Sequence, residues 1–201
     1  TPSKHLKSVV EKWGVKENKI KVIYNGTNII PISDRNLDLK TINLITVGRL
    51  APFKNIDRII HSLKKVSFEN RNFRLFVVGD GPERRNLELL VKKLELENKV
   101  IFTGQLKERE LNSYYNDSDI YIQASGYEGL PHTLLEAISH NLSIISTPIG
   151  GTNEILEDNK NGWTVELVDG KYPSEDQIAF KISEILKNKE KDNIKKIRAR
   201  K

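Results

Sequence analysis

The chain has 201 residues, of which 37% are hydrophobic, so it can bury one core and forms one main domain by default. It contains no cysteine, which excludes a disulfide framework and a zinc site made of cysteines. Its formal net charge is +6, but residues 187–201 carry eight Lys or Arg against two acidic residues and supply the whole excess. The rest of the chain is nearly neutral and shows no interleaving of aromatic and basic residues, so the charge does not indicate nucleic-acid binding.

The first 41 residues predict one helix, one strand and a linker. Residues 3–14 begin with a serine that can cap a helix, place apolar side chains on one face, and end in a glycine that can terminate it. Residues 19–26, KIKVIYNG, predict a short strand closed by an Asn-Gly turn. The polar residues 31–41 predict a linker. No apolar run approaches the roughly 18 residues that a membrane span needs. Since methionine is absent, even at position 1, we expect a piece of a longer protein.

From residue 42 onward, apolar runs of strand length alternate with segments that repeat apolar residues at three- and four-residue spacing. Continuously apolar strands that alternate with helices indicate a parallel sheet covered on both faces. We therefore expect an α/β fold with a doubly wound, Rossmann-like parallel sheet. The expected strands are 42–48, 73–79, 99–104, 119–125, 142–147 and 162–166, and the expected helices are 55–66, 82–97, 107–117, 132–140 and 174–190.

Each of the first five expected strands runs into a loop that contains glycine. In a parallel sheet these loops meet at one edge, outside the carboxyl ends of the strands, where ligands bind. Glycine lets a backbone approach a ligand or another backbone closely, although it is also common at strand-to-helix turns. Five such loops at one edge favour a binding cleft. Their sequences are GRLAPFKN, GDGPE, GQL, SGYEGLPHT and TPIGGTNE.

Arg49 and Lys54 flank the loop after the first of these strands. Two cations at the carboxyl edge can grip a diphosphate, Arg through its planar fork and Lys as a compact charge. The alternative is that both are solvated loop charges, and these two residues alone do not decide between the two interpretations.

The segment GLPHTLLEA predicts an anion site beside a buried-looking carboxylate. Pro131 suits the first helical position, which leaves the amides of His132, Thr133 and Leu134 at an open helix end. Such an end carries a positive partial charge of roughly half a unit and favours phosphate. Glu136 lies one turn further along, and its side chain leans back toward that end. A carboxylate beside phosphates needs neutral donors, so we interpret Glu136 as a ligand of ribose hydroxyls; the alternative is a salt bridge to a lysine.

Glu128 lies on the loop that leads into this helix. It is placed to face whatever is attached to the diphosphate, and the alternative is a loop carboxylate in water.

Competing motifs are weaker. GDGPE at 79–83 is neither a dinucleotide fingerprint nor a P-loop, because no Gly-Lys-Ser/Thr follows it. Asp-Ser-Asp at 117–119 imitates a metal-binding pair, but it lies between a predicted helix and strand, where capping is the simpler role. The four histidines have no metal-ligand spacing. Ser125 lacks the sequence of a nucleophile elbow.

Five segments, VGRLAPFKN, VVGDGPERRNLE, VIFTGQL, YEGLPHTLLEA and IISTPIGGTNEIL, in this order and spacing, resemble the donor-binding domain of retaining GT-B glycosyltransferases of family 4. YEGLPHTLLE fits the E-x7-E motif of that family. The resemblance covers roughly residues 3–187. A single one of these motifs is weak, but five in register are highly specific.

The resemblance implies the C-terminal, Rossmann-like half of a two-domain enzyme that uses a nucleotide sugar of the UDP or GDP type. It implies that Arg49 and Lys54 bind the diphosphate, that Glu136 binds ribose, and that Glu128 lies near the donor sugar. It further implies no metal and no cofactor besides the donor. The backbone near Gln105 and Leu106 would meet the base, and the diphosphate would be held by the amides of Gly129, Leu130, Pro131, His132, Thr133 and Leu134; proline, which has no N–H, can contribute only its position.

The resemblance also implies a division of the chain. Residues 1–41 would be the end of an N-terminal domain and the interdomain linker, 42–190 the nucleotide-sugar-binding domain, and 191–201 a truncated basic helix, which either stays in water or touches an anionic membrane surface. The saccharide or lipid-linked acceptor would bind through the missing N-terminal domain, so this piece alone is expected to turn over little. A cytoplasmic location, at most at the inner face of a membrane, is expected for glycan, lipopolysaccharide or capsule synthesis.

One segment departs from the family pattern. AISHNLSIIST has His140 to Ser143 where the family usually shows a small residue and then Gly-Leu-Pro, and this difference affects packing detail more than function. The rival functions are a nucleotide-sugar epimerase of the same architecture, a dinucleotide-binding oxidoreductase domain without its glycine fingerprint, and a non-catalytic nucleotide-binding or docking module.

Overall fold

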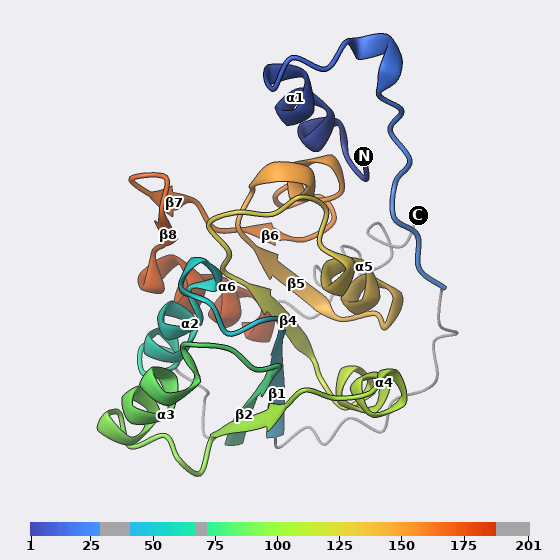
Figure 1. Ribbon diagram of the computed structural model, residues 1–201. Coiled ribbons are helices and arrows are strands. Elements are labelled where there is room, and N and C mark those ends of the chain that lie inside the picture. Colours follow the sequence, from blue (N-terminus) through green and yellow to red (C-terminus); the bar gives the residue numbers. More distant parts are fainter. Residues whose placement is uncertain (29–40, 67–71, 188–201) are drawn as a thin grey trace.

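A computed structural model describes residues 1–28, 41–66 and 72–187 (Figure 1). Within them a six-stranded sheet runs in the order β3-β2-β1-β4-β5-β6, and all its neighbouring strands are parallel. The doubly wound fold and the six strands expected from the sequence are confirmed, although the later strands are shorter than expected. The strands are β1 (Thr41–Val47), β2 (Asn72–Val78), β3 (Val100–Gly104), β4 (Ile120–Gln123), β5 (Ser143–Ser146) and β6 (Trp163–Thr164).

The strand order reverses between β1 and β4, which lie side by side although three α-helices and two strands separate them along the chain. At such a switch point the connections leave to opposite faces and open a crevice at the carboxyl edge. The loops after β1 and β4 therefore flank the position at which this fold places a ligand.

Helices cover both faces of the sheet (Figure 1). Along a strand, alternate side chains face opposite sides, and so Leu44 packs with the helices of one layer while Ile45 packs with those of the other. The first layer holds α2 (Ile56–Leu63), α3 (Arg84–Lys93) and α6 (Glu175–Lys187), and the second holds α4 (Glu108–Asn116) and α5 (His132–Ser139). Each was expected from the sequence within a few residues at its ends.

Residues 1–28 contain the expected helix but not the expected strand. Ser3 is buried and caps α1 (Lys4–Lys12) by accepting a hydrogen bond from the amide of Leu6. The strand predicted over 19–26 is wrong: a short 3-10 turn, η1 (Glu17–Lys19), is followed by extended backbone that pairs with no strand among the described residues. A strand needs a ladder partner for its backbone groups, and this segment is instead held by backbone hydrogen bonds with Thr1 and by the side chains of Tyr24 and Asn25.

One further difference concerns the second half of the chain. A small antiparallel pair, β7 (Leu167–Val168) and β8 (Tyr172–Pro173), was not predicted, although Asp169-Gly170 between them, both with positive φ, is a typical hairpin turn. Most of the predicted linker 31–41, the end of the helix 174–190 and the basic segment 191–201 lie outside the described residues. In the part of the chain that the structure describes, none of the helices has the length and apolar character needed to cross a bilayer.

Glu154 fastens α1 to the sheet domain. It ends the 3-10 turn η3 (Gly150–Glu154), and its carboxylate accepts the amides of Lys4 and His5 at 3.0 and 2.8 Å and the hydroxyl of Tyr24 at 2.8 Å. Partial burial disfavours the charge of the carboxylate, but these hydrogen bonds outweigh burial, so the pKa of Glu154 lies below its usual range.

The docking of α1 is therefore expected to depend on pH. Because the pKa of Glu154 is lower in the folded state, its ionised form stabilises the docked helix above the ordinary glutamate pKa, and this stabilisation is lost as the pH falls through the lowered value. After correction for intrinsic rates, the amides of α1 should exchange with deuterium faster at acid pH than at pH 7. Glu154→Ala should exchange fast at pH 7 already, whereas the exposed Glu157→Ala should resemble the wild type. Equal protection of α1 in all three proteins at pH 7 would contradict this role.

Candidate functional site

Lys54 and Glu128 form an ion pair at the switch point. Lys54 ends the 3-10 turn η2 (Pro52–Lys54) after β1, and its Nζ lies 2.6 Å from Oε1 of Glu128 in the loop after β4. The two loops are tied together, because Asn55 donates to the carbonyl of Ala124 at 2.9 Å and the amide of Gly126 donates to the carbonyl of Phe53 at 2.7 Å. Both charged side chains are mostly buried, with 19% and 11% exposed, so solvated loop charges are the wrong interpretation for this pair.

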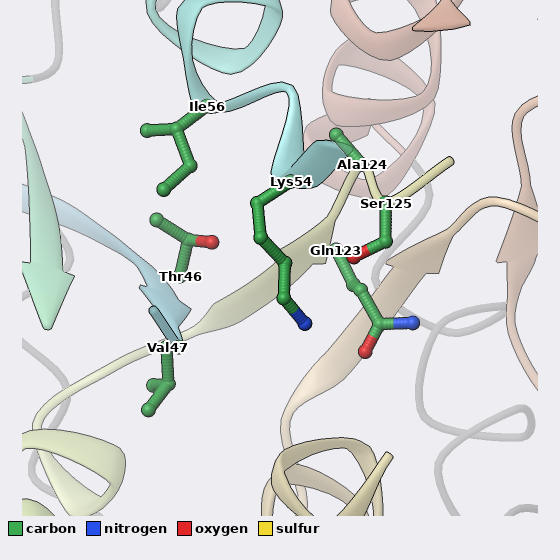
Figure 2. Close-up of a pocket in the computed structure, with 8 residues that line it drawn as sticks. Thr46, Val47, Lys54, Ile56, Gln123, Ala124 and Ser125 are labelled. Carbon is green, nitrogen blue, oxygen red and sulfur yellow. The ribbon is translucent and has the colours of Figure 1, made fainter. Parts of the chain in front are cut away.

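Lys54 passes through a small pocket between the ends of β1 and β4. Figure 2 shows its side chain between Thr46 and Val47 of β1 and Gln123 of β4. Ser125 lines the same pocket; its hydroxyl is buried and has no hydrogen-bond partner within the described residues. A buried polar atom without a partner costs about 1–3 kcal/mol, so this hydroxyl is available to a polar group that enters beside the ammonium.

Arg49 lines a larger cleft next to this pocket. Its side chain is exposed, and it lines a cleft of about 530 Å³ together with Asp80 and Gln105. Gly48 lines both the cleft and the Lys54 pocket, so the two are adjacent. The structure thus brings Gln105 to the same cleft as Arg49, while Leu106 is partly buried against the core under α4 and α5.

The helix end predicted to bind an anion is present, with one difference. Pro131 was expected as the first helical residue, but its backbone is extended, with ψ of 119°, and it is the N-cap instead. The helix therefore starts at His132, and no side chain caps the end. The amides of His132, Thr133 and Leu134 are the first of the helix and have no acceptor one turn earlier. Leu130 and Leu134 are buried, whereas His132 is exposed.

The loop before this helix is held by backbone contact with the loop after β5. The amide of Gly151 donates to the carbonyl of Gly129 at 2.8 Å. Gly150 has φ of +53°, and a Cβ placed on it would overlap the carbonyl oxygen of Glu128. Only glycine allows this approach without strain, so the glycines of TPIGGTNE set the position of the loop that carries Glu128.

Glu136 is bound by a tyrosine, not by a lysine. The hydroxyl of Tyr115 in α4 donates to its Oε2 at 3.0 Å, and in the described part of the chain no Lys or Arg lies within ion-pair distance of it. The salt bridge considered as an alternative is therefore wrong for these residues. Glu136 remains partly exposed, which leaves carboxylate surface for another donor.

The competing motifs have structural roles. Asp117 is the C-cap residue of α4, and Asp119 accepts the amide of Asn43 in β1 at 2.9 Å. Among the described residues no group of three or more His, Asp or Glu side chains is arranged to hold a metal ion; that the protein works without metal stays a prediction.

Sequence reasoning missed Asn55 and Tyr115 in this region, and it considered Ser125 only as a nucleophile. Asn55 shows a weak signal, since Lys-Asn before a helix is a typical place for a left-handed residue, and its φ is 49°. Tyr115 and Glu136 are 21 residues apart on different helices. The apolar pattern along a helix does not reveal which residues of another helix pack against it.

Comparison with known proteins decides the family. The family model described as Glycosyl transferases group 1 matches residues 32–201. The chain belongs to this family. The sheet described above is the Rossmann-like half of a GT-B glycosyltransferase fold, as the resemblance implied.

Individual relatives of this group 1 domain span a wide range of organisms. An uncharacterized glycosyltransferase of Methanocaldococcus jannaschii, MJ1607, is 32% identical over 92% of this chain and 50% of its own length. The putative colanic acid biosynthesis glycosyltransferase WcaL of Escherichia coli is 27% identical over 85% of this chain and 44% of its own length. The crystal structure of Anabaena Alr3699/HepE in complex with UDP and glucose superposes with a TM-score of 0.87 at 20% identity, over 100% of this chain and 56% of that one. The chain thus spans about half the length of these relatives.

Replacing Gly150 by alanine should destabilise the group 1 domain. The new Cβ would overlap the Glu128 carbonyl and would also occupy a left-handed conformation, so we expect a loss of about 3 kcal/mol in the free energy of unfolding. Gly170→Ala is the matched control, because Gly170 has φ of +65° but nothing lies within 4 Å of its added Cβ; it should lose about 1 kcal/mol. Urea unfolding measures both, and equal losses would show that the backbone contact does not matter.

Proposed function

We propose that this chain is the donor-binding half of a retaining GT-B glycosyltransferase of family 4, which transfers a sugar from a nucleoside diphosphate to a hydroxyl of an acceptor. The observation that supports this most is the convergence, at one switch point, of a buried Lys54–Glu128 pair, an uncapped helix end and a second carboxylate, Glu136. No single one of these groups is specific. Together they would match the successive parts of a nucleotide sugar: Glu136 the ribose, Lys54 and the helix end the diphosphate, and Glu128 the sugar.

The diphosphate would lie between the two cations and the start of α5. Arg49 offers a planar fork from the open cleft, and Lys54 a compact charge from the pocket. The first amides of α5 add dipoles directed at the same anion. These groups would stabilise the charge that grows on the leaving nucleoside diphosphate, so no metal ion is required in this proposal.

Glu136 would accept ribose hydroxyls. It lies one turn inside the helix whose first amides face the diphosphate, and the ribose is the next group along a nucleotide. The base would then enter the cleft that Arg49 shares with Gln105 and meet the backbone near Gln105 and Leu106. A donor of the UDP or GDP type fits, and the presence of UDP in the Anabaena complex supports UDP.

Glu128 would face the donor sugar and steer it or shield the developing positive charge at its anomeric carbon. It would do so while holding Lys54 at 2.6 Å, so the cation is oriented before the donor arrives. The acceptor would be supplied through the other half of the longer protein. The name of the E. coli relative, a putative colanic acid biosynthesis glycosyltransferase, supports a role in glycan, lipopolysaccharide or capsule synthesis. A cytoplasmic location, with peripheral contact at the inner face of the membrane, is part of the same proposal.

A panel of ligands tests the proposal. The 201-residue chain should be stabilised against heat by UDP- or GDP-sugars and by the corresponding nucleoside diphosphate, by about 2.7 kcal/mol at a hundredfold excess over Kd. NAD and ADP-sugars at the same concentration serve as controls and should have less effect. If no nucleotide shifts the unfolding temperature, the donor-binding proposal is wrong.

Lys54→Ala tests the diphosphate site. Loss of one charge-assisted contact should cost about 2 kcal/mol, which is roughly thirtyfold in Kd for the nucleoside diphosphate on this chain and in kcat/KM for the full enzyme. Lys64→Ala removes an exposed lysine of the same loop-helix region and should bind like the wild type. Because the substitution also leaves Glu128 without its cation, affinity is measured by calorimetry well below the unfolding temperature. Unchanged affinity in Lys54→Ala would reject this role.

A further inference from the structure

The hydroxyl group of Tyr115 donates a hydrogen bond to the carboxylate of Glu136. The tyrosine belongs to α4, its side chain is fully buried, and its hydroxyl lies 3.0 Å from Oε2 of Glu136 and 3.3 Å from the carbonyl of Thr133, both in α5. The shorter of these contacts involves the carboxylate, which is the stronger acceptor. A phenylalanine would fill the same space, so packing alone does not account for the hydroxyl.

The ring of His140 packs against the ring of Tyr115. The two rings are stacked, with centroids 5.1 Å apart and planes inclined by 24°. The ring nitrogens of His140 lie 2.9 and 3.2 Å from the side-chain oxygens of Asn116 and Asn112, both in α4. His140, at the end of α5, is thus fastened to the helix that carries Tyr115, and the two helices clamp the phenol between them.

A phenol suits this position because it is a neutral donor. It has one hydrogen to give, so it fixes one oxygen of Glu136 without neutralising the carboxylate, as a lysine would. Burial raises the pKa of Tyr115 well above its usual value, which keeps the hydroxyl protonated at neutral pH. The carboxylate of Glu136 keeps acceptor positions on its exposed side.

We propose that Tyr115 is a positioning residue whose hydroxyl fixes the carboxylate of Glu136 in the orientation that accepts two adjacent hydroxyls of a ribose, with His140 holding the phenol in place. The inference rests on the proposed donor site and deepens it, since it makes recognition of the ribose depend on a residue that does not touch the nucleotide. An unfixed glutamate would lose rotamer entropy when it binds, and a fixed one does not.

The consequence is selectivity for ribose over its 2′-deoxy form. A carboxylate held in one orientation rejects a sugar that lacks one of the two hydroxyls, because one acceptor then stays unsatisfied. A carboxylate that is free to turn adapts and discriminates less. Pyrophosphate, which has no sugar, should be insensitive to Tyr115.

Calorimetry on the 201-residue chain tests this with UDP, GDP, their 2′-deoxy forms and pyrophosphate. The wild type should prefer the ribonucleotide over the deoxynucleotide about tenfold, as expected for one hydrogen bond to a charged group. Tyr115→Phe, which keeps the ring and the stack, should reduce this ratio to about threefold or less without changing the affinity for pyrophosphate. Tyr114→Phe is the matched control, because Tyr114 is the neighbouring tyrosine of α4 and packs against Phe76 instead; it should keep the wild-type ratio.

The outcomes separate the two proposals. If the wild type binds neither nucleotide, the donor site itself is wrong and the inference fails with it. If the wild type binds but does not prefer ribose, diphosphate binding stands and the roles of Glu136 and Tyr115 fail. If Tyr115→Phe keeps the wild-type ratio, only the positioning role fails, whatever happens to its unfolding temperature.

His140 gives an independent check. His140→Ala removes the stacked ring and should lower the ribose preference as Tyr115→Phe does, whereas His140→Phe restores a ring and should recover most of it. A purely structural role would lower the unfolding temperature of His140→Ala without moving the ratio, and that result would overturn the part assigned to His140.

Discussion

The candidate site depends on how closely the loop backbones approach at the carboxyl edge of the sheet. A Cβ on Gly79 would overlap the carbonyl of Gly48, and a Cβ on Gly150 would overlap the carbonyl of Glu128. The first contact joins the loops after β1 and β2, and the second joins those after β4 and β5. Larger residues would displace the loops that carry Lys54 and Glu128, the two partners of the ion pair. The position of the Lys54–Glu128 pair therefore depends on four loops packed backbone to backbone.

The charges at this edge are arranged so that an incoming anion is not opposed. Burying a lysine and a glutamate together costs desolvation that their attraction only partly offsets, but the pair is close to neutral as a unit. The open end of α5 and the exposed Arg49 then favour an anion. Asp80, which lines the cleft with Arg49, lies 3.7 Å from Nη1 of Arg84. The carboxylate of Glu136 would repel an anion. It lies one turn inside the helix, however, and is hydrogen-bonded to Tyr115, so in the proposed site it would face a neutral part of the ligand.

Most of the sheet was predictable from the sequence, because buried parallel strands are continuously apolar and every predicted strand from residue 42 onward is present. The strand predicted over 19–26 failed because its apolar residues find no ladder partner, and pattern alone does not reveal a partner. Arg49, Lys54, Glu128 and Glu136 were proposed as site residues from residue type and spacing, and their roles stay predictions. Their partners were not predicted, since the Lys54–Glu128 and Tyr115–Glu136 contacts join residues 74 and 21 positions apart. Such contacts follow from tertiary packing, which has no local signature.

The loop that carries Glu128 and Gly129 also contacts the N-terminal helix α1. A Cβ on Gly129 would meet the side chain of Leu6, and one on Gly150 would come within 3.4 Å of the ring of His5. Glu154, at the end of the same 3-10 turn, accepts the first amides of α1. The turn η3 therefore touches α1 on one side and the Glu128 loop on the other, so a movement of either is felt by both.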